Sequence, residues 1–235
     1  MKRPKIIAHR GVFDNESVIE NTLESFQKAI HFQYAIEFDV QLTTDNQLVI
    51  FHDDDLKRLA NRNDIVQEMD SSELTRIKLL NTNQTIPYLR DVLELNHNQV
   101  LMDIEIKPTK RIKDTIFYLM KELEKEQNYV IISFDPRIIR YLKKNYPNVE
   151  TGLLINTKYK YLIQKWILQS KFILKYTKCD FVAISKKLYR NKRIQKRLKN
   201  YPIFLWTIKD GKEINYKDQI TYVCNNLPYK KEKDV

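Results

Sequence analysis

Short apolar runs alternate with longer amphipathic stretches along the chain. The runs are rich in β-branched and aromatic residues and predict strands at 6–9, 35–40, 48–52, 100–106, 129–134, 151–155, 180–185, 203–207 and 221–224. Between them, apolar residues recur every three or four positions and predict helices at 22–32, 89–95, 112–126, 136–145, 159–176 and 191–199. This alternation of strand and helix is typical of a parallel sheet with helical crossovers.

One connection is too short for a crossover helix. The turn-forming segment 43–46 joins the strands predicted at 35–40 and 48–52, so we expect the second of them to fold back antiparallel as a β-hairpin arm. The other eight predicted strands would all be parallel. In a chain of 235 residues, eight strand–helix units favour the α/β class and a (β/α)8 TIM barrel.

The stretch 53–85 is polar and only weakly periodic, and it lies just after the hairpin. We expect it to be an inserted cap or lid after the second barrel strand. No Gly/Ser-rich linker interrupts the rest of the pattern, which predicts a single catalytic domain over 1–228. Residues 229–235 are expected to form a loose basic C-terminal tail.

Composition excludes several classes of site. The three glycines, Gly11, Gly152 and Gly211, are too far apart for a dinucleotide fingerprint or a Walker-type phosphate loop. The two cysteines, Cys179 and Cys224, lack the spacing of a disulfide framework or a zinc knuckle, which predicts buried reduced thiols. No apolar run approaches the roughly 18–20 residues of a membrane span or forms a secretory signal, so a cytoplasmic location is expected.

The net charge of +11 is unevenly spread. The first 117 residues hold 15 Lys and Arg against 19 Asp and Glu, and the remaining 118 hold 26 against 11. The basic half favours peripheral contact with an anionic membrane surface or a polyanion, although lysine-rich solvated helix faces would give the same composition. The helix predicted at 159–176 has a second apolar stripe that includes Phe172 and Tyr176. This stripe indicates a membrane surface, a second copy in a homo-oligomer, or a helix buried on two sides.

Ionisable residues gather at the predicted carboxyl ends of neighbouring strands, where barrel enzymes carry their active sites. Residues spaced i, i+2 on a strand share a face. In the predicted hairpin His52 lies opposite Phe38, which brings an imidazole beside the second strand. The residues are His9 and Arg10 on the first strand, Glu37 and Asp39 on the second, and Asp103, Glu105 and Lys107 on the next barrel strand.

Converging carboxylates inside a barrel are costly unless a cation compensates them. Hard oxygen ligands without cysteine favour Ca²⁺ or Mg²⁺. The two histidines are suited to acid and base catalysis near neutral pH, and Arg10 and Lys107 to binding an anionic group. Together these residues predict the cleavage of a phosphodiester. Asp103 has a second interpretation, as the buried partner of a cation.

The same segments resemble the glycerophosphodiester phosphodiesterase family. The resemblance runs from Ala8 to about Pro228 and rests on Ala8-His9-Arg10-Gly11, Glu20-Asn21-Thr22, Ile36-Glu37-Phe38-Asp39-Val40-Gln41-Leu42-Thr43, Val49-Ile50-Phe51-His52-Asp53, Ile104-Glu105-Ile106-Lys107, Ser133-Phe134 and Trp206-Thr207. It implies a (β/α)8 barrel with an insertion after the His-Asp motif. It also implies metal-dependent hydrolysis of glycerophosphodiesters to sn-glycerol 3-phosphate and an alcohol, in which a neighbouring glycerol hydroxyl can attack first.

Site roles follow from the resemblance residue by residue. It implies that His9 and His52 are the acid/base pair, that Glu37, Asp39 and Glu105 hold the metal, and that Arg10 and Lys107 bind the phosphate. Glu20 and Asn21 are expected to shape and cap the entrance to the first helix. Phe134 and Trp206 are interpreted equally well as pocket walls or as core. The chain departs from the family at Gln33 and Asn46, where the family often has glycine. It also departs in the closing pattern Thr-Asp-x-Pro, which appears as Asn225-Asn226-Leu227-Pro228 and lacks the acid.

Two alternatives remain open. The first is a relative that acts on a larger glycerol-phosphate polymer or a lysophospholipid. The second is a noncatalytic basic barrel that binds nucleic acid; it predicts loss of at least one of the seven catalytic groups, yet all are present, and no nucleic-acid module is visible. The expected partner is therefore a small-molecule glycerophosphodiester, and no nucleic acid is expected.

Overall fold

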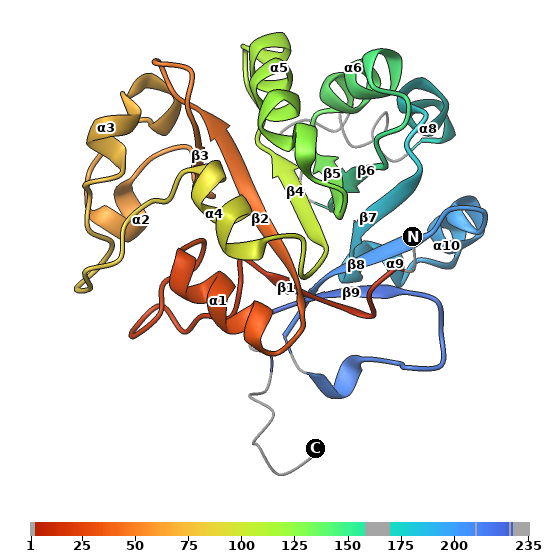
Figure 1. Cartoon of the computed structure of the whole chain (residues 1–235). Helices are drawn as coiled ribbons and strands as arrows, with labels where there is room; N and C mark the ends of the chain where they lie inside the picture. Colours follow the sequence, from red (N-terminus) through yellow and green to blue (C-terminus); the bar gives the residue numbers. More distant parts are fainter. Residues whose placement is uncertain (1–2, 158–169, 210, 226, 228–235) are drawn as a thin grey trace.

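Eight parallel strands close into a barrel in the computed structural model, which describes residues 3–157, 170–209, 211–225 and 227 (Figure 1). Strand β1 pairs with both β2 and β9, and this closes the sheet. The predicted TIM barrel is confirmed. In the described part of the chain its strands are β1 (Ile6–His9), β2 (Ala35–Leu42), β4 (Met102–Ile106), β5 (Tyr129–Ser133), β6 (Thr151–Ile155), β7 (Phe181–Ser185), β8 (Ile203–Ile208) and β9 (Thr221–Cys224).

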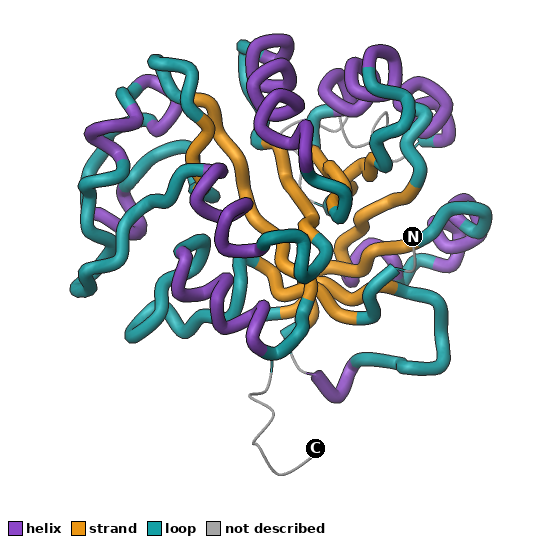
Figure 2. Tube along the Cα trace, viewed as in Figure 1, coloured by secondary structure: helices purple, strands orange, loops and turns teal. Residues whose placement is uncertain are grey.

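Helices surround the barrel (Figure 2). Their apolar residues pack on the outward-facing apolar residues of the strands. Local sequence sets their ends: the Thr22 side chain caps α1, and Asp135 followed by Pro136 starts α6. The described helices outside the segment 53–85 are α1 (Leu23–His31), α4 (Leu89–Asn96), α5 (Ile112–Glu122) with the 3-10 turn η2 (Leu123–Lys125), α6 (Pro136–Asn145), α8 (Lys171–Thr177), α9 (Lys186–Tyr189) and α10 (Lys192–Leu198), and η3 (Gly211–Glu213) precedes β9.

The barrel interior has its own small apolar cluster, built from every second residue of the strands. Phe181 of β7 stacks on Phe204 of β8 with ring centroids 4.2 Å apart. Gly152 on β6 leaves room for this stack, since a Cβ there would lie 2.3 Å from the Phe181 ring. Apolar packing therefore fills one end of the barrel, and the carboxyl ends of β1, β2 and β4 carry the charged side chains.

The hairpin arm is confirmed with its predicted register. Strand β3 (Leu48–Ile50) runs antiparallel to β2 and pairs Val40 with Ile50 and Leu42 with Leu48. Asn46 in the turn has φ 64°, a left-handed conformation that asparagine tolerates well. The strand ends two residues before the predicted position 52, because the chain turns away after the Phe51 N–H donates to the Asp39 carbonyl.

The segment 53–85 packs beside the hairpin, on the left in Figure 1. It contains α2 (Lys57–Ala60), the 3-10 turn η1 (Val66–Glu68) and α3 (Ser71–Leu74). Its apolar residues form a separate cluster with Val49 and Phe51 at the hairpin. A lid role for this segment stays a prediction.

The helix predicted at 159–176 falls partly on residues 158–169, which lie outside the described residues, as does the predicted tail at 229–235. The described part of this region is helix α8. Its residues Ile173 and Leu174 are buried, whereas the side chain of Phe172 is 68% exposed and that of Tyr176 is 40% exposed. The prediction of a helix buried on two sides is therefore wrong for α8, because Phe172 and Tyr176 stack on each other at the surface.

Both predicted thiols are confirmed as free and buried at Cys179 and Cys224. Among the described residues, no helix combines the length and apolarity that a bilayer crossing requires.

Candidate active site

The register of three adjacent strands brings the predicted site residues together. His9 on β1 pairs with Glu37 on β2, and Glu37 pairs in turn with Asp103 on β4. Two residues further along, Asp39 pairs with Glu105. Since alternate residues of a strand face the same side, these carboxylates point into one end of the barrel.

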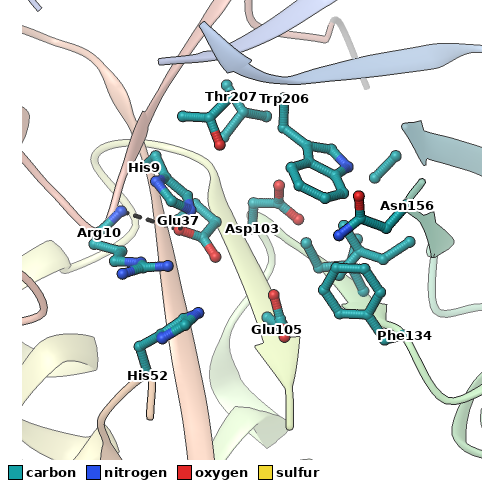
Figure 3. A pocket seen from close by; sticks show the side chains of 14 residues that line it. His9, Arg10, Glu37, His52, Asp103, Glu105, Phe134, Asn156, Trp206 and Thr207 are labelled. Carbon is teal, nitrogen blue, oxygen red and sulfur yellow. Dashed lines mark hydrogen bonds and ion pairs between the residues drawn. The ribbon is translucent and has the colours of Figure 1, made fainter. Parts of the chain in front are cut away.

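The side chains surround a cavity of about 230 Å³ (Figure 3). His9, Arg10 and His52 lie on one side of it, with the carboxylates on its floor and an aromatic wall opposite. Lys107 and Asp39 lie outside its lining. The described lining consists of His9, Arg10, Glu37, His52, Asp103, Glu105, Ile132, Phe134, Leu154, Asn156, Ala183, Trp206, Thr207 and Val223.

Glu37, Asp39 and Glu105 form a group of carboxylates that fits a cation. One oxygen from each lies within 4.8 Å of the others, and the three residues are at most 6% exposed. Burial, followed by the charges of Asp39 and Glu105, raises the pKa of Glu37 well above its ordinary value. Such crowding of like charges is relieved by a divalent cation bound through oxygen ligands.

Asp39 is the best stabilised of these carboxylates. Lys107 Nζ lies 3.2 Å from Asp39 Oδ1 and 2.9 Å from Glu105 Oε1, and the Asn21 amide donates to Asp39 Oδ2 at 2.9 Å. Although burial raises the pKa of Asp39, the charges of Lys107, His52 and Arg10 bring it below the ordinary value. Lys107, predicted to bind phosphate, is therefore ion-paired with the carboxylates in this structure.

The ring of His9 is fixed by Asn225, which follows β9. His9 Nδ1 lies 2.6 Å from Asn225 Oδ1, and because an amide oxygen only accepts, Nδ1 carries the proton. Nε2 is then free to accept a proton, 3.9 Å from Glu37 Oε2. Burial and the neighbouring charge of Arg10 lower the pKa of His9 to about 4, so the ring is neutral at pH 7.

His52 is oriented in the same way by its neighbour in sequence. Its Nδ1 donates to Asp53 Oδ1 at 2.6 Å, and Arg58 Nε donates to Asp53 Oδ2 at 2.7 Å. Burial raises the pKa of Asp53, but the hydrogen bonds from His52 and Arg58 outweigh this and hold it below the ordinary value. A fixed carboxylate on Nδ1 leaves Nε2 of His52 toward the cavity.

Glu20 links Arg10 to the inserted segment, which the sequence did not indicate. Arg10 Nη1 donates to Glu20 Oε1 at 2.7 Å, and Arg58 from the inserted segment binds both Glu20 oxygens. Burial opposes ionisation of Glu20, yet the hydrogen bond from Arg58 and the charge of Arg10 lower its pKa to about 2. The helix cap is Thr22, so the predicted capping role of Glu20 and Asn21 is wrong: their side chains turn toward site residues instead.

The turn after β1 depends on Gly11. Arg10 has φ 58° and Gly11 φ 81°, both left-handed. A Cβ on Gly11 would lie 2.5 Å from Ser25 Oγ of α1, so this turn has no room for a side chain there. The close approach to α1 directs the Arg10 backbone N–H to Glu37 Oε2, 2.9 Å away.

Asp103 is fully buried on the cavity floor, and neither of its oxygens has a hydrogen-bond partner among the described residues. No side-chain cation among the described residues pairs with it, so its interpretation as the buried partner of a cation stays a prediction. Burial, with a contribution from the charge of Glu105, raises its pKa well above the ordinary value.

Phe134 and Trp206 form the wall opposite the histidines (Figure 3). Their ring centroids are 5.7 Å apart at an interplanar angle of 89°. They also pack on the interior apolar cluster, so they serve as wall and core at once.

Comparison with known proteins agrees with this geometry. The chain matches the model of the glycerophosphoryl diester phosphodiesterase family over residues 9–224. It is 32% identical over 173 residues to a glycerophosphodiester phosphodiesterase from Caldanaerobacter subterraneus subsp. tengcongensis, covering 68% of this chain and 69% of the relative.

Solved structures share the fold. A glycerophosphodiester phosphodiesterase from Thermotoga maritima superposes with a TM-score of 0.73 at 25% identity, covering 95% of this chain and 94% of that one. A phosphodiesterase from Oleispira antarctica, solved with the product sn-glycerol-3-phosphate, has a TM-score of 0.76 at 22% identity and covers 94% and 92% of the two chains. Since the family match runs from His9 to Cys224 and so includes every candidate site residue from His9 to Trp206, the chain belongs to the glycerophosphoryl diester phosphodiesterase family and is a hydrolase of phosphoric diesters.

Proposed function

We propose that this protein hydrolyses glycerophosphodiesters to sn-glycerol 3-phosphate and an alcohol, with a divalent cation, Ca²⁺ or Mg²⁺, held by Glu37, Asp39 and Glu105. The observation that carries the proposal is one cavity that joins buried carboxylates to two imidazoles, each with its Nδ1 tied to an oxygen acceptor. The product bound to the Oleispira antarctica relative supports the choice of substrate.

The bound cation would stabilise negative charge on the phosphoryl oxygens and orient the attacking hydroxyl. Arg10 lies at the cavity edge, with its guanidinium held by Glu20, and binds the phosphate. Lys107 holds two of the carboxylates in place and offers its charge to the same phosphate.

The two imidazoles move the protons. His9 is neutral and has Nε2 unprotonated, so it takes the proton of the attacking hydroxyl, either a neighbouring glycerol hydroxyl or water. His52, whose Nδ1 is tied to Asp53, gives a proton from Nε2 to the leaving alcohol oxygen. If the glycerol hydroxyl attacks first, the same pair acts in reverse when water opens the cyclic phosphate.

The test is release of glycerol 3-phosphate from glycerophosphocholine with added Ca²⁺ or Mg²⁺. We expect turnover that chelation abolishes, and the variants His9→Ala and His52→Ala to lose it while still binding metal. His97→Ala is the matched control, because His97 ends α4 away from the cavity lining. Salt-sensitive DNA binding without hydrolysis of any glycerophosphodiester would instead support the noncatalytic alternative.

A further inference from the structure

A second cleft adjoins the catalytic cavity at the carboxyl ends of β6, β7 and β8. It has a volume of about 440 Å³, and Asn156, Trp206 and Thr207 line both hollows. Figure 3 shows Asn156 and Trp206 on the side of the catalytic cavity that faces away from His52. The two hollows therefore meet along the aromatic wall, opposite the acid/base pair.

The cleft is basic. Its described lining includes Lys186 and Lys187 of α9 and also Arg190, which directly follows α9. This described lining contains no Asp or Glu. Lys186 forms an ion pair with Glu213, which neutralises its charge. Lys187 and Arg190 are exposed, and within the described ranges no ion pair with a carboxylate involves either of them. Two uncompensated cations thus face the same small space.

Buried polar atoms at the cleft wall also lack partners. Ser185, at the end of β7, is 7% exposed, and its Oγ has no hydrogen-bond partner in the part of the chain that the structure describes. The indole Nε1 of Trp206 is likewise buried without a partner there. Unsatisfied donors of this kind are costly to keep and are relieved when a ligand oxygen approaches them.

Resting on the proposed function, we propose that this cleft is a subsite for a phosphate group carried by the leaving alcohol. The scissile phosphodiester binds at the carboxylates and Arg10, the alcohol passes along Trp206, and its own phosphate binds Lys187 and Arg190. Cationic side chains bind phosphate by charge-assisted hydrogen bonds, whereas a choline head group would meet like charge here. The preferred substrates are then glycerophosphodiesters whose alcohol is itself phosphorylated.

Two substrates that differ by one phosphate test the subsite: glycerophosphoglycerol and glycerophosphoglycerophosphate. We expect wild-type kcat/KM to favour the phosphorylated substrate by about tenfold, the size of one or two charge-assisted contacts. The double variant Lys187→Ala/Arg190→Ala should remove this preference, and Lys187→Arg/Arg190→Lys should retain most of it. The matched control is Arg193→Ala/Lys196→Ala on α10, which removes the same charge from exposed residues outside the cleft lining and should keep the wild-type ratio.

The outcomes separate the two proposals. The subsite is overturned, and the proposed function stands, if the wild type hydrolyses both substrates with no preference. The same conclusion follows if both double alanine variants lower the preference equally. Hydrolysis of neither substrate overturns both. A short glycerol-phosphate oligomer distinguishes the sources of the phosphate: a further rise in kcat/KM identifies a polymer, and no rise identifies a single phosphorylated head group.

Discussion

The Arg58 guanidinium and the Glu20 carboxylate form a two-point ion pair, with Nη1 2.8 Å from Oε2 and Nη2 2.7 Å from Oε1. The third nitrogen, Nε, binds Asp53, which holds His52. One side chain from the inserted segment thus connects His52, through Asp53, to Arg10, through Glu20, on the same side of the cavity.

The first prediction concerns this connection. Arg58→Met should lower kcat/KM by about ten- to a hundredfold, because both Asp53 and Glu20 lose their shared partner. Arg58→Lys should recover only part of it, since an ammonium cannot bind two carboxylates in the same fork geometry. The control is Arg62→Met in the same segment. Arg62 also binds two carboxylates, Asp64 and Glu73, but within the described residues no ion pair joins either of them to a site residue. Equal losses in the two Met variants would contradict a positioning role.

The second prediction concerns metal binding. Glu37→Gln should weaken Ca²⁺ or Mg²⁺ binding, measured by calorimetry, by about tenfold or more, because the cation loses a charged oxygen ligand. Glu124→Gln, which changes an exposed carboxylate in η2, serves as the control and should bind as the wild type does. An unchanged affinity in Glu37→Gln would remove Glu37 from the ligand set.

The third prediction concerns the protonation of His9. With its pKa lowered to about 4 by burial and by Arg10, the ring should stay neutral at pH 6, as followed by NMR of the imidazole nitrogens. Asn225→Asp should raise this pKa, because a carboxylate on Nδ1 stabilises the imidazolium. A wild-type midpoint near 6.5 would contradict the buried, neutral state.

The fourth prediction concerns Asp103 and the pH dependence of stability. Its pKa is raised in the folded protein, so above the ordinary pKa of an aspartate the unfolded chain releases a proton that the folded chain keeps. Stability from this group is therefore lost as pH rises, by about 1.4 kcal/mol per pH unit until the folded pKa is reached.

The isosteric variant Asp103→Asn should relieve this loss. In metal-free protein, its free energy of unfolding relative to wild type should increase between pH 4.5 and 7, as measured by urea denaturation. A difference that stays constant with pH would show that Asp103 does not titrate differently on folding.

Local patterns were sufficient for the barrel and for the main site residues. The turn at 43–46 set the hairpin register, and strand alternation placed Glu37 and Asp39 on one face. The hairpin register and the shared strand face each depend on residues a few positions apart, and over such short separations the backbone geometry determines which side chains lie together.

The contacts that cross between loops could not be predicted in this way. Arg58 and Glu20 are 38 positions apart, and no periodicity relates the short helix α2 to the loop before α1. The departure from the family's closing pattern at 225–228 gave no sign that the amide oxygen of Asn225 accepts a hydrogen bond from His9. Side-chain reach across irregular loops, not strand or helix period, determines such pairs.

The hydrogen bond between His9 and Asn225 also bears on how the enzyme matures. The two residues are 216 positions apart and come from opposite ends of the described sequence, joined only where β9 seals against β1. A chain still emerging from the ribosome has its imidazoles and carboxylates long before it has the acceptor that sets the His9 tautomer. The acid/base role proposed for His9 therefore depends on the docking of β9, the final strand of the described chain, onto β1.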